Sequence, residues 1–187
     1  MGDRQAPQPL ALVQELVNTL DVETGADGLA SPGDLDRFTR ENGLTGIRLG
    51  TRDIEGLREL REALRAACLA HTGGTVPQDA GAEAGFEAVL ERKLSRAPLV
   101  LRLGADGTAA LRPAPGLTGL AALTAQVAAG IAAAAADGTW ERLKACEAHD
   151  CLWVYYDRSP GARRRWCRMD LCGSRAKMRA YRARRGE

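Results

Sequence analysis

The chain has 187 residues, 45% of them hydrophobic and 27% charged, which suits a soluble protein with one ordinary domain and a small module. We judge its apolar runs too short to span a membrane, and its first residues lack a secretory signal, so we expect a cytoplasmic protein without a membrane partner. Its net charge of +2 is the sum of −5 over residues 1–140 and +7 over residues 141–187. The second part contains 13 Lys and Arg and 6 Asp and Glu, and such a basic segment favours a polyanionic partner.

The chain begins with two predicted helices. Residues 10–20 repeat apolar side chains at the spacing of one helical face. The second helix should begin at Ser31, whose side chain can cap free amide groups, with Pro32 in its first turn. Asn42-Gly43 supplies its end.

Two longer helices follow. Thr51 can cap a third helix that ends before Gly73-Gly74, and residues 83–94 suit a fourth. Because Cys68 lies on the apolar stripe of the third helix, we interpret it as a core residue rather than a nucleophile. The residues that we expect to point inward are Ile54, Leu57, Leu60, Leu64, Cys68, Phe86, Val89 and Leu90.

A short apolar run that begins at residue 98, followed by a turn signal, predicts a β-hairpin. Residues 98–103 and 108–112 resemble strands, and Asp106-Gly107 between them suits a left-handed turn. A fifth helix should then run from residue 117 to Asp137-Gly138. We therefore predict a mainly helical α+β fold, with a helical domain and one hairpin over residues 1–138 and a small module over residues 139–187.

Four of the five cysteines form two matched pairs, Cys146/Cys151 and Cys167/Cys172. Each pair encloses four residues, and two such knuckles can share one tetrahedral zinc ion. In the cytoplasm, paired cysteines are more often metal ligands than disulfides. We therefore predict a closed, structural Zn²⁺ site, which supplies folding free energy to a module too small for a sufficient core of its own.

Other interpretations of the four cysteines stay open at this point. Two disulfides, free structural thiols or an iron–sulfur cluster would use the same residues. His149 could replace one cysteine as a ligand, but four well-spaced cysteines make it superfluous, and we expect it in a solvated loop. Because a catalytic zinc would keep an open coordination position, we predict no enzyme and no catalytic residue.

Aromatic and basic residues surround the cysteines. A strand is expected over residues 153–157, followed by a turn at residues 158–161. Zinc with four thiolates carries a formal charge of −2, which nearby arginines can offset. The aromatic residues that we expect to form a small core around the metal are Trp153, Tyr155, Tyr156 and Trp166.

The chain ends in a predicted basic helix over residues 173–185. Arg175, Arg179 and Arg182 share one face, whereas Met178 and Tyr181 can pack on the metal site. Such a helix can follow phosphates or enter a major groove, although a solvated, frayed helix is the alternative. The residues predicted to contact nucleic acid are Arg163, Arg164, Arg165, Arg168, Arg175, Lys177, Arg179, Arg182, Arg184 and Arg185.

The end of the chain resembles the signature of the bacterial CGNR zinc-finger family. The matching strings are Trp166-Cys167-Arg168-Met169, Cys172-Gly173-Ser174-Arg175-Ala176-Lys177 and Tyr181-Arg182, with Cys146-x4-Cys151, Asp157-x-Ser159 and the arginine run upstream. The earlier part is similar to the ABATE domain that precedes this finger. Its matching strings are Val17-Asn18-Thr19-Leu20-Asp21, Asp34-Leu35, Gly43-Leu44 and residues 60–65.

The resemblance implies a stress-induced transcription regulator that binds DNA and holds zinc through the four cysteines. Arg175 matches the arginine of the signature. Ser174 stands where the signature has Asn, and Arg168 where it has Ser. These departures leave the predicted metal ligands intact and remove the basis for assigning a base contact to position 174.

Three functions are consistent with these features. In the first, residues 1–138 sense a signal or dimerise and residues 139–187 bind DNA, in a cytoplasmic, nucleoid-associated regulator. In the second, the module binds RNA, with Tyr155 or Tyr156 stacked on unpaired bases. In the third, it binds an acidic protein, which could be the acidic part of its own chain. No motif specifies a small-molecule effector, and a homodimer would suit two DNA half-sites.

Overall fold

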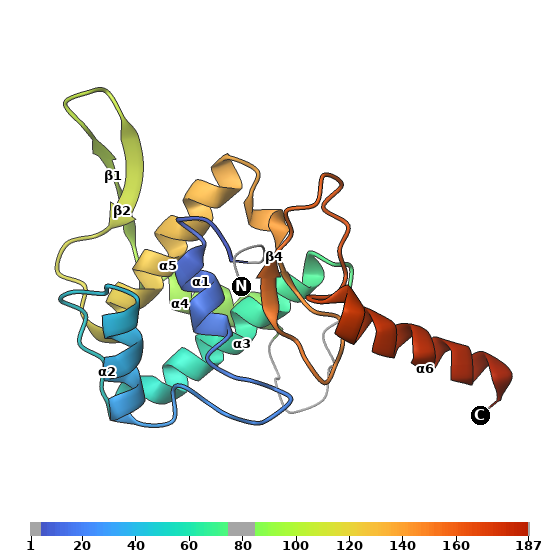
Figure 1. Cartoon of the computed structure of the whole chain (residues 1–187). Helices are drawn as coiled ribbons and strands as arrows, with labels where there is room; N and C mark the ends of the chain where they lie inside the picture. Colours follow the sequence, from blue (N-terminus) through green and yellow to red (C-terminus); the bar gives the residue numbers. More distant parts are fainter. Residues whose placement is uncertain (1–4, 75–84, 187) are drawn as a thin grey trace.

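Figure 1 shows the arrangement of the chain in a computed structural model that describes residues 5–74 and 85–186. Within these residues, six α-helices and two small antiparallel hairpins form most of the regular structure. The predicted mainly helical α+β fold is therefore confirmed. The first hairpin and the last helix extend from opposite ends of the body (Figure 1).

The first two helices agree with the prediction apart from their ends. Helix α1 covers Ala11–Val17, which is shorter than the predicted residues 10–20. Helix α2 covers Pro32–Glu41, and the Ser31 hydroxyl accepts a hydrogen bond from the Asp34 N–H at 3.3 Å. The predicted cap is thus confirmed, and the helix stops at Asn42 as expected.

The third helix begins differently from the prediction. A single 3-10 turn, η2, covers Thr51–Asp53, and helix α3 covers Ile54–Ala70. Thr51 makes no capping hydrogen bond; the Asp53 carboxylate instead accepts one from the Gly50 N–H at 2.8 Å. The predicted apolar stripe is correct, because its central residues are buried at Leu57, Leu60, Leu64 and Cys68.

Helix α4 covers Phe86–Leu94 and lies against α3. Its predicted start at residue 83 lies outside the described residues. The expected inward residues are only half-buried, because α4 sits at the edge of the core. Glu59 of α3 pairs with Arg92 at 3.1 Å and with Lys93 at 2.6 Å, and these ion pairs join the two helices.

Helix α5 covers Gly119–Ala136. It contradicts our expectation that every apolar run is too short to span a membrane. By length and composition alone, its 18 residues are long and apolar enough to cross a membrane. Within the protein, 44% of this helix is buried, and Leu123, Val127 and Ala134 belong to the core. Core helices of soluble proteins share this composition, so packing against α1, α3 and α4 accounts for its apolar character.

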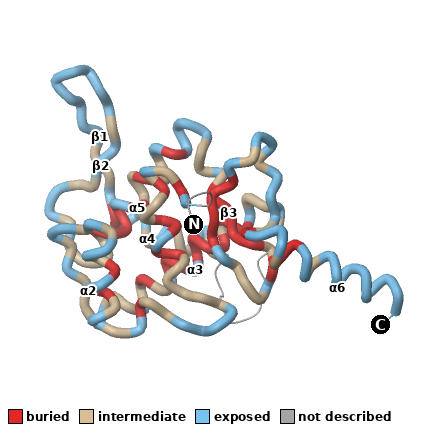
Figure 2. The backbone as a smooth tube through the Cα atoms, viewed as in Figure 1, coloured by how far each residue is buried: buried red, intermediate tan, exposed pale blue. Residues whose placement is uncertain are grey.

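The predicted hairpin is confirmed. Strand β1 covers Leu99–Leu103 and pairs with β2, Ala109–Pro113, in an antiparallel register. Gly107 has a φ of +80°, which is the left-handed turn geometry that Asp-Gly favours. The base of the hairpin contacts α5, while its outer part is exposed (Figure 2).

One hydrophobic core connects the helices to the cysteine-rich end of the chain. A second hairpin, formed by β3 (Leu143–Ala145) and β4 (Val154–Tyr156), packs against α1 and α3. Its residues Leu143, Val154 and Tyr156 join the same buried cluster as residues of these helices. The module is therefore anchored on the helical part, and helix α6, Ser174–Arg185, extends from it into solvent (Figures 1 and 2).

Candidate metal centre and basic surface

The first cysteine pair flanks the turn that joins β3 and β4. Cys146 directly follows β3, and its N–H donates to the Trp153 carbonyl at 3.0 Å, which extends the ladder by one bond. Cys151 closes a tight turn, because its N–H donates to the Ala148 carbonyl at 2.9 Å. Leu152 then takes a positive φ of 50°, which redirects the chain into β4.

The second pair flanks an unusual helical turn. Cys167 precedes, and Cys172 lies within, a π-helical turn, η4, that covers Met169–Gly173. The turn is closed by the Gly173 N–H, which donates to the Arg168 carbonyl at 3.0 Å. Such wide turns are frequent at functional sites, and this one brings the Cys172 sulfur back toward Cys167.

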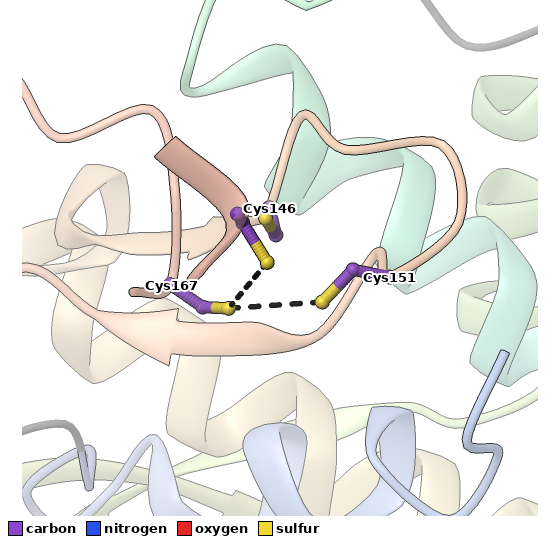
Figure 3. Close-up of side chains that lie close together, drawn as sticks. Cys146, Cys151 and Cys167 are labelled. Atoms are coloured by element: carbon purple, nitrogen blue, oxygen red, sulfur yellow. Dashed lines mark hydrogen bonds between the residues drawn. The ribbon is translucent and has the colours of Figure 1, made fainter. Parts of the chain in front are cut away.

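The four cysteine sulfur atoms converge on one point. All four lie within 4.8 Å of one another, and the Cys167 sulfur is 3.6 Å from that of Cys151 and 3.7 Å from that of Cys172. Figure 3 shows the labelled Cys146, Cys151 and Cys167 side chains directed toward one another. Tetrahedral zinc with Zn–S bonds of about 2.3 Å separates its sulfur ligands by about 3.8 Å. The cluster therefore fits a four-thiolate metal ion, whereas the disulfide interpretation is wrong, because none of these cysteines forms a disulfide in the structure.

The proton affinities of the cluster also favour a cation. Hydrogen bonds from Cys151 and Cys167 lower the pKa of the Cys146 thiol. The hydrogen bond to Cys146 raises the pKa of Cys151 to about 12. Hydrogen bonds with Cys146 and Cys151 raise the pKa of Cys167. Four thiols at this spacing cannot all ionise unless a positive charge offsets their repulsion, which a bound dication supplies.

Buried Asp157 holds the loop that carries the first group of arginines. Its carboxylate accepts hydrogen bonds from the Ser159 hydroxyl at 2.6 Å and from the Arg164 N–H at 2.9 Å. Buried Lys144 lies 3.4 Å from it and also donates to the Ala162 carbonyl. Burial by itself raises the pKa of Asp157, but these hydrogen bonds and the Lys144 charge outweigh burial and lower it.

The predicted arginines of this loop lie together on the surface beside the cysteines. Arg165 pairs with Glu147 at 2.5 Å and stacks on the Trp166 ring at 5.1 Å. Arg168 pairs with Asp170 at 2.7 Å. Residues 163–170 line an open hollow of about 640 Å³, so the loop presents a concave basic surface.

Helix α6 carries the remaining predicted basic residues and has no buried side chain. Arg175 lies 3.1 Å from Glu23, and Arg179 lies 3.9 Å from Asp150, so these two arginines face acidic groups of the body. Arg175, Arg179 and Arg182 line one shallow hollow, in agreement with the predicted common face.

Two expectations about packing at this end are wrong. Met178 and Tyr181 are exposed, because α6 extends past the metal site and does not fold back on it. The predicted aromatic core is also incomplete: Trp153 is exposed, and Tyr156 joins the main core of the molecule. Tyr155 alone of the four is fully buried beside the cysteines, where its hydroxyl donates to the Arg164 carbonyl at 2.8 Å.

Comparison with known families matches both parts of the chain. The ABATE family model, described as "putative stress-induced transcription regulator", matches residues 10–138. The CGNR zinc-finger model matches residues 142–185, which include the four cysteines and all of the predicted basic contact residues. The chain belongs to the ABATE family and carries a CGNR zinc finger. No curated protein matches it. The predicted family and the structural zinc are thus confirmed.

Sequence reasoning missed the side chain that attaches the CGNR finger to the ABATE part. Asn18, just after α1, pairs with both polar groups of Val154 in β4. Its amide oxygen accepts from the Val154 N–H, and its amide nitrogen donates to the Val154 carbonyl, each at 2.8 Å. Gln14 donates to the same carbonyl at 3.1 Å. The only signal for Asn18 in the sequence was its place in the Val17–Asp21 string that resembles ABATE.

A buried arginine completes this attachment. Arg65 of α3 donates to the Leu152 carbonyl of the finger at 2.9 Å and to the Val17 carbonyl of α1 at 2.8 Å. Its position within the apolar stripe of α3 was the available signal, because a buried arginine needs several acceptors. The finger is therefore joined to two ABATE helices by polar contacts as well as by the shared core.

Cys68 and His149 do not belong to the group of four candidate metal ligands. Cys68 is fully buried in the main core, and burial raises the pKa of its thiol to about 12, which suppresses its reactivity. His149 is exposed in the loop between the first two cysteines, as predicted. The two families are regulatory and zinc-binding rather than enzymatic.

Proposed function

We propose that this ABATE protein is a DNA-binding transcriptional regulator of the bacterial cytoplasm, associated with the nucleoid. Helix α6 is the observation that carries the proposal. It leaves the metal site as an exposed helix of 12 residues, with six basic and no acidic side chains. A helix of this length is about 18 Å long, enough to lie in a major groove or along a row of phosphates.

The arginine loop, residues 163–168, supplies a second contact surface next to this helix. Arg168 has an exposed acidic partner in Asp170, and exposed ion pairs are weak enough to be exchanged for DNA phosphates. Arg165 is itself exposed, although its partner Glu147 is largely buried. Arginine suits this exchange because its guanidinium group binds phosphate in a bidentate manner. We assign the loop to backbone contacts and α6 to the groove.

The zinc ion has a structural role in this proposal. Cys146, Cys151, Cys167 and Cys172 hold it, and the ion fixes turn η4, from which α6 begins. Residues 1–138 then form the part that senses a signal or dimerises, and residues 139–187 form the part that binds DNA. Because the two parts share a core, a change in the first can alter the position of α6.

Titration of zinc-loaded protein into labelled duplex DNA at several salt concentrations tests the proposal. Removal of each side chain that binds a phosphate should reduce the slope of log affinity against log salt by about 0.9. Lys177→Ala/Arg182→Ala/Arg184→Ala should therefore reduce the slope by about 2 to 3. The matched control, Arg37→Ala/Arg40→Ala/Arg52→Ala, removes the same charge from an exposed region around α2 and should leave the slope unchanged. Equal effects of the two triple variants would contradict the assignment.

Selection of bound fragments from genomic DNA tests for sequence recognition. We expect a few sites to be enriched by the wild-type protein and to disappear with Arg175→Ala/Arg179→Ala/Arg182→Ala. Uniform recovery of fragments would instead indicate binding to the DNA backbone without sequence recognition.

RNA binding is the second candidate, and exposed aromatic side chains favour it. Trp153 and Tyr181 are exposed, Tyr181 on the basic helix α6, and both could stack on unpaired bases. The prediction that Tyr155 or Tyr156 has this role is wrong, because both are buried. Competition between single-stranded RNA and duplex DNA at equal salt separates the two candidates: displacement of the duplex by a smaller amount of RNA would favour RNA.

A further inference from the structure

The hairpin formed by β1 and β2 presents an apolar face to solvent. Because side chains alternate along a strand and paired residues share a face, the register places six apolar residues on one side. Within this face, Leu101, Leu103 and Leu111 are 63%, 74% and 42% exposed. We call it the leucine face, and it consists of Leu99, Leu101, Leu103, Ala109, Leu111 and Pro113.

The opposite face of the hairpin has the reverse character. It carries Val100, Arg102, Ala110 and Arg112, and its two apolar residues are half-buried. A hairpin that stays exposed normally turns its polar face to water and its apolar face to the core. In this hairpin the more apolar face is the less covered one, which indicates that a partner covers the leucine face.

We propose that the leucine face is the contact between two copies of this chain, packed face to face about a twofold axis. A twofold contact requires a surface that complements itself, and an uncharged apolar face does so without burying a charge. Back-to-back packing is disfavoured, because it would bring Arg102 and Arg112 of one copy against those of the other. The other exposed large apolar residues of the described chain are less suitable as the surface that the leucine face contacts, since most of them lie among the arginines of the finger and α6.

The charges at the two ends of the hairpin specify the orientation of the copies. The tip carries Asp106, which the Thr108 N–H and hydroxyl hold in place at 3.0 and 2.7 Å. Exposed Arg96 lies just before the base of β1. When the hairpins pack antiparallel, each tip lies toward the base of the other copy, so Asp106 approaches the partner copy's Arg96. Parallel packing would place like charges together.

This interface is compatible with the basic surface. The leucine face and α6 lie at opposite ends of the molecule, so dimerisation leaves both copies of α6 free (Figure 1). The leucine face has six residues, whereas each partner of a standard stable interface contributes about 20–30 residues and roughly 800 Å². We therefore expect a reversible dimer with a dissociation constant in the micromolar range. The inference does not depend on DNA binding and is tested without nucleic acid.

Sedimentation equilibrium of the zinc-loaded full chain, from about 1 to 300 μM, tests the proposal. The mass should rise from 19.9 kDa toward twice that value. Leu101→Glu/Leu103→Glu should raise the dissociation constant at least about tenfold. The matched control, Arg102→Gln/Arg112→Gln, lowers the net charge by the same two units on the opposite face and should dimerise at least as well as the wild type. A single-chain mass throughout, or a dimer unaffected by Leu101→Glu/Leu103→Glu, would overturn the proposal.

Two further measurements address the fold and the orientation. A photoreactive residue placed at position 103 of the otherwise unchanged chain should give crosslinked dimers, and one at position 102 should not; the reverse pattern would contradict the leucine face. Asp106→Arg and Arg96→Asp should each weaken the dimer, and the double variant should restore it. Damage to the turn alone cannot produce that rescue, and failure of the rescue would overturn the antiparallel arrangement.

Discussion

At the residue scale, Asn18 shows how one side chain joins two parts of a chain. It satisfies the N–H and the carbonyl of Val154, which lie 136 positions away in the sequence. Since unsatisfied buried groups cost more than a hydrogen bond gains, the loss of one such side chain affects both parts at once.

Asn18→Ala should lower the free energy of unfolding of the zinc-loaded chain by about 1–3 kcal/mol, because it leaves the Val154 N–H without its partner. Denaturant unfolding measures this change, and zinc titration should show a weaker apparent affinity. Asn42→Ala is the control, since Asn42 donates only locally, to the Phe38 carbonyl at the end of α2. If Asn18→Ala left both quantities unchanged, the attachment would have no energetic role.

Asp27 gives the ABATE part a defined response to acid. It pairs with Arg61 at 2.6 Å and with Arg58 at 3.1 Å. Burial raises the pKa of Asp27, but the hydrogen bond from Arg61, the Leu29 N–H and the two arginine charges outweigh burial and lower it. A lowered pKa in the folded state means that the pair stabilises fully above the ordinary aspartate value of about 3.9, and this stabilisation is lost as the pH falls.

Asp27→Asn should therefore lower the free energy of unfolding by about 1.5–3 kcal/mol at neutral pH. The difference from the wild type should stay constant down to about pH 5 and shrink below about pH 4. Comparing the two proteins at each pH cancels acid-induced metal loss, which affects both equally. Asp36→Asn, at an exposed position of α2, should show no such difference; a pH-independent difference for Asp27→Asn would contradict the ion-pair explanation.

At the element scale, α6 is a basic helix held in position by weak contacts. Its ion pairs with Glu23 and Asp150 join exposed side chains, and a DNA phosphate can replace either acid. One hypothesis was that the basic module binds the acidic part of its own chain. The ion pair between Arg175 of α6 and Glu23 of the ABATE part is one contact of this kind.

Glu23→Gln should raise DNA affinity by up to about fivefold at low salt, because it releases Arg175 from an exposed pair. The gain should disappear at high salt, where such pairs are screened. Fluorescence anisotropy with one duplex at two salt concentrations measures the effect. Glu41→Gln, at the end of α2, is the control for the change of net charge. An equal gain in both variants would contradict the idea that the Arg175–Glu23 pair inhibits DNA binding.

The β1–β2 hairpin and helix α5 both have apolar faces, but only that of α5 is covered by other elements. Turn chemistry and apolar periodicity predicted that both elements exist. Whether an apolar face is covered depends on which elements lie next to it: α5 packs against three helices, whereas the outer part of the leucine face has no cover within the described chain.

At the scale of the whole molecule, the shared core makes the metal site part of the global fold. Leu143, Val154 and Tyr156 of the finger hairpin are buried together with residues of α1 and α3. Loss of zinc should therefore destabilise the ABATE part as well as the finger, since structural zinc supplies on the order of 10 kcal/mol to small zinc modules.

Removal of zinc with a chelator should lower the melting temperature of the whole chain by at least about 5–10 °C. Scanning calorimetry should show one transition for the zinc-loaded protein. Cys172→Ser should reproduce the chelator result without chelator. Two separate transitions, with the helical part melting at the same temperature in both states, would show that the parts fold independently.

The sequence by itself determined the features that depend on a few neighbouring residues. The cysteine spacing, the Ser31 cap, the Asp106-Gly107 turn and the stripe of α3 were all predicted, because metal knuckles, caps, turns and helical faces are set by local chemistry.

Only the tertiary structure decided which groups meet across the chain. It paired Asn18 with Val154, assigned Tyr156 to the main core, left Met178 and Tyr181 in solvent, and gave Arg175 an acidic partner. Each of these outcomes depends on segments far apart in the sequence that come together through burial of a common core. No local spacing or propensity encodes that proximity.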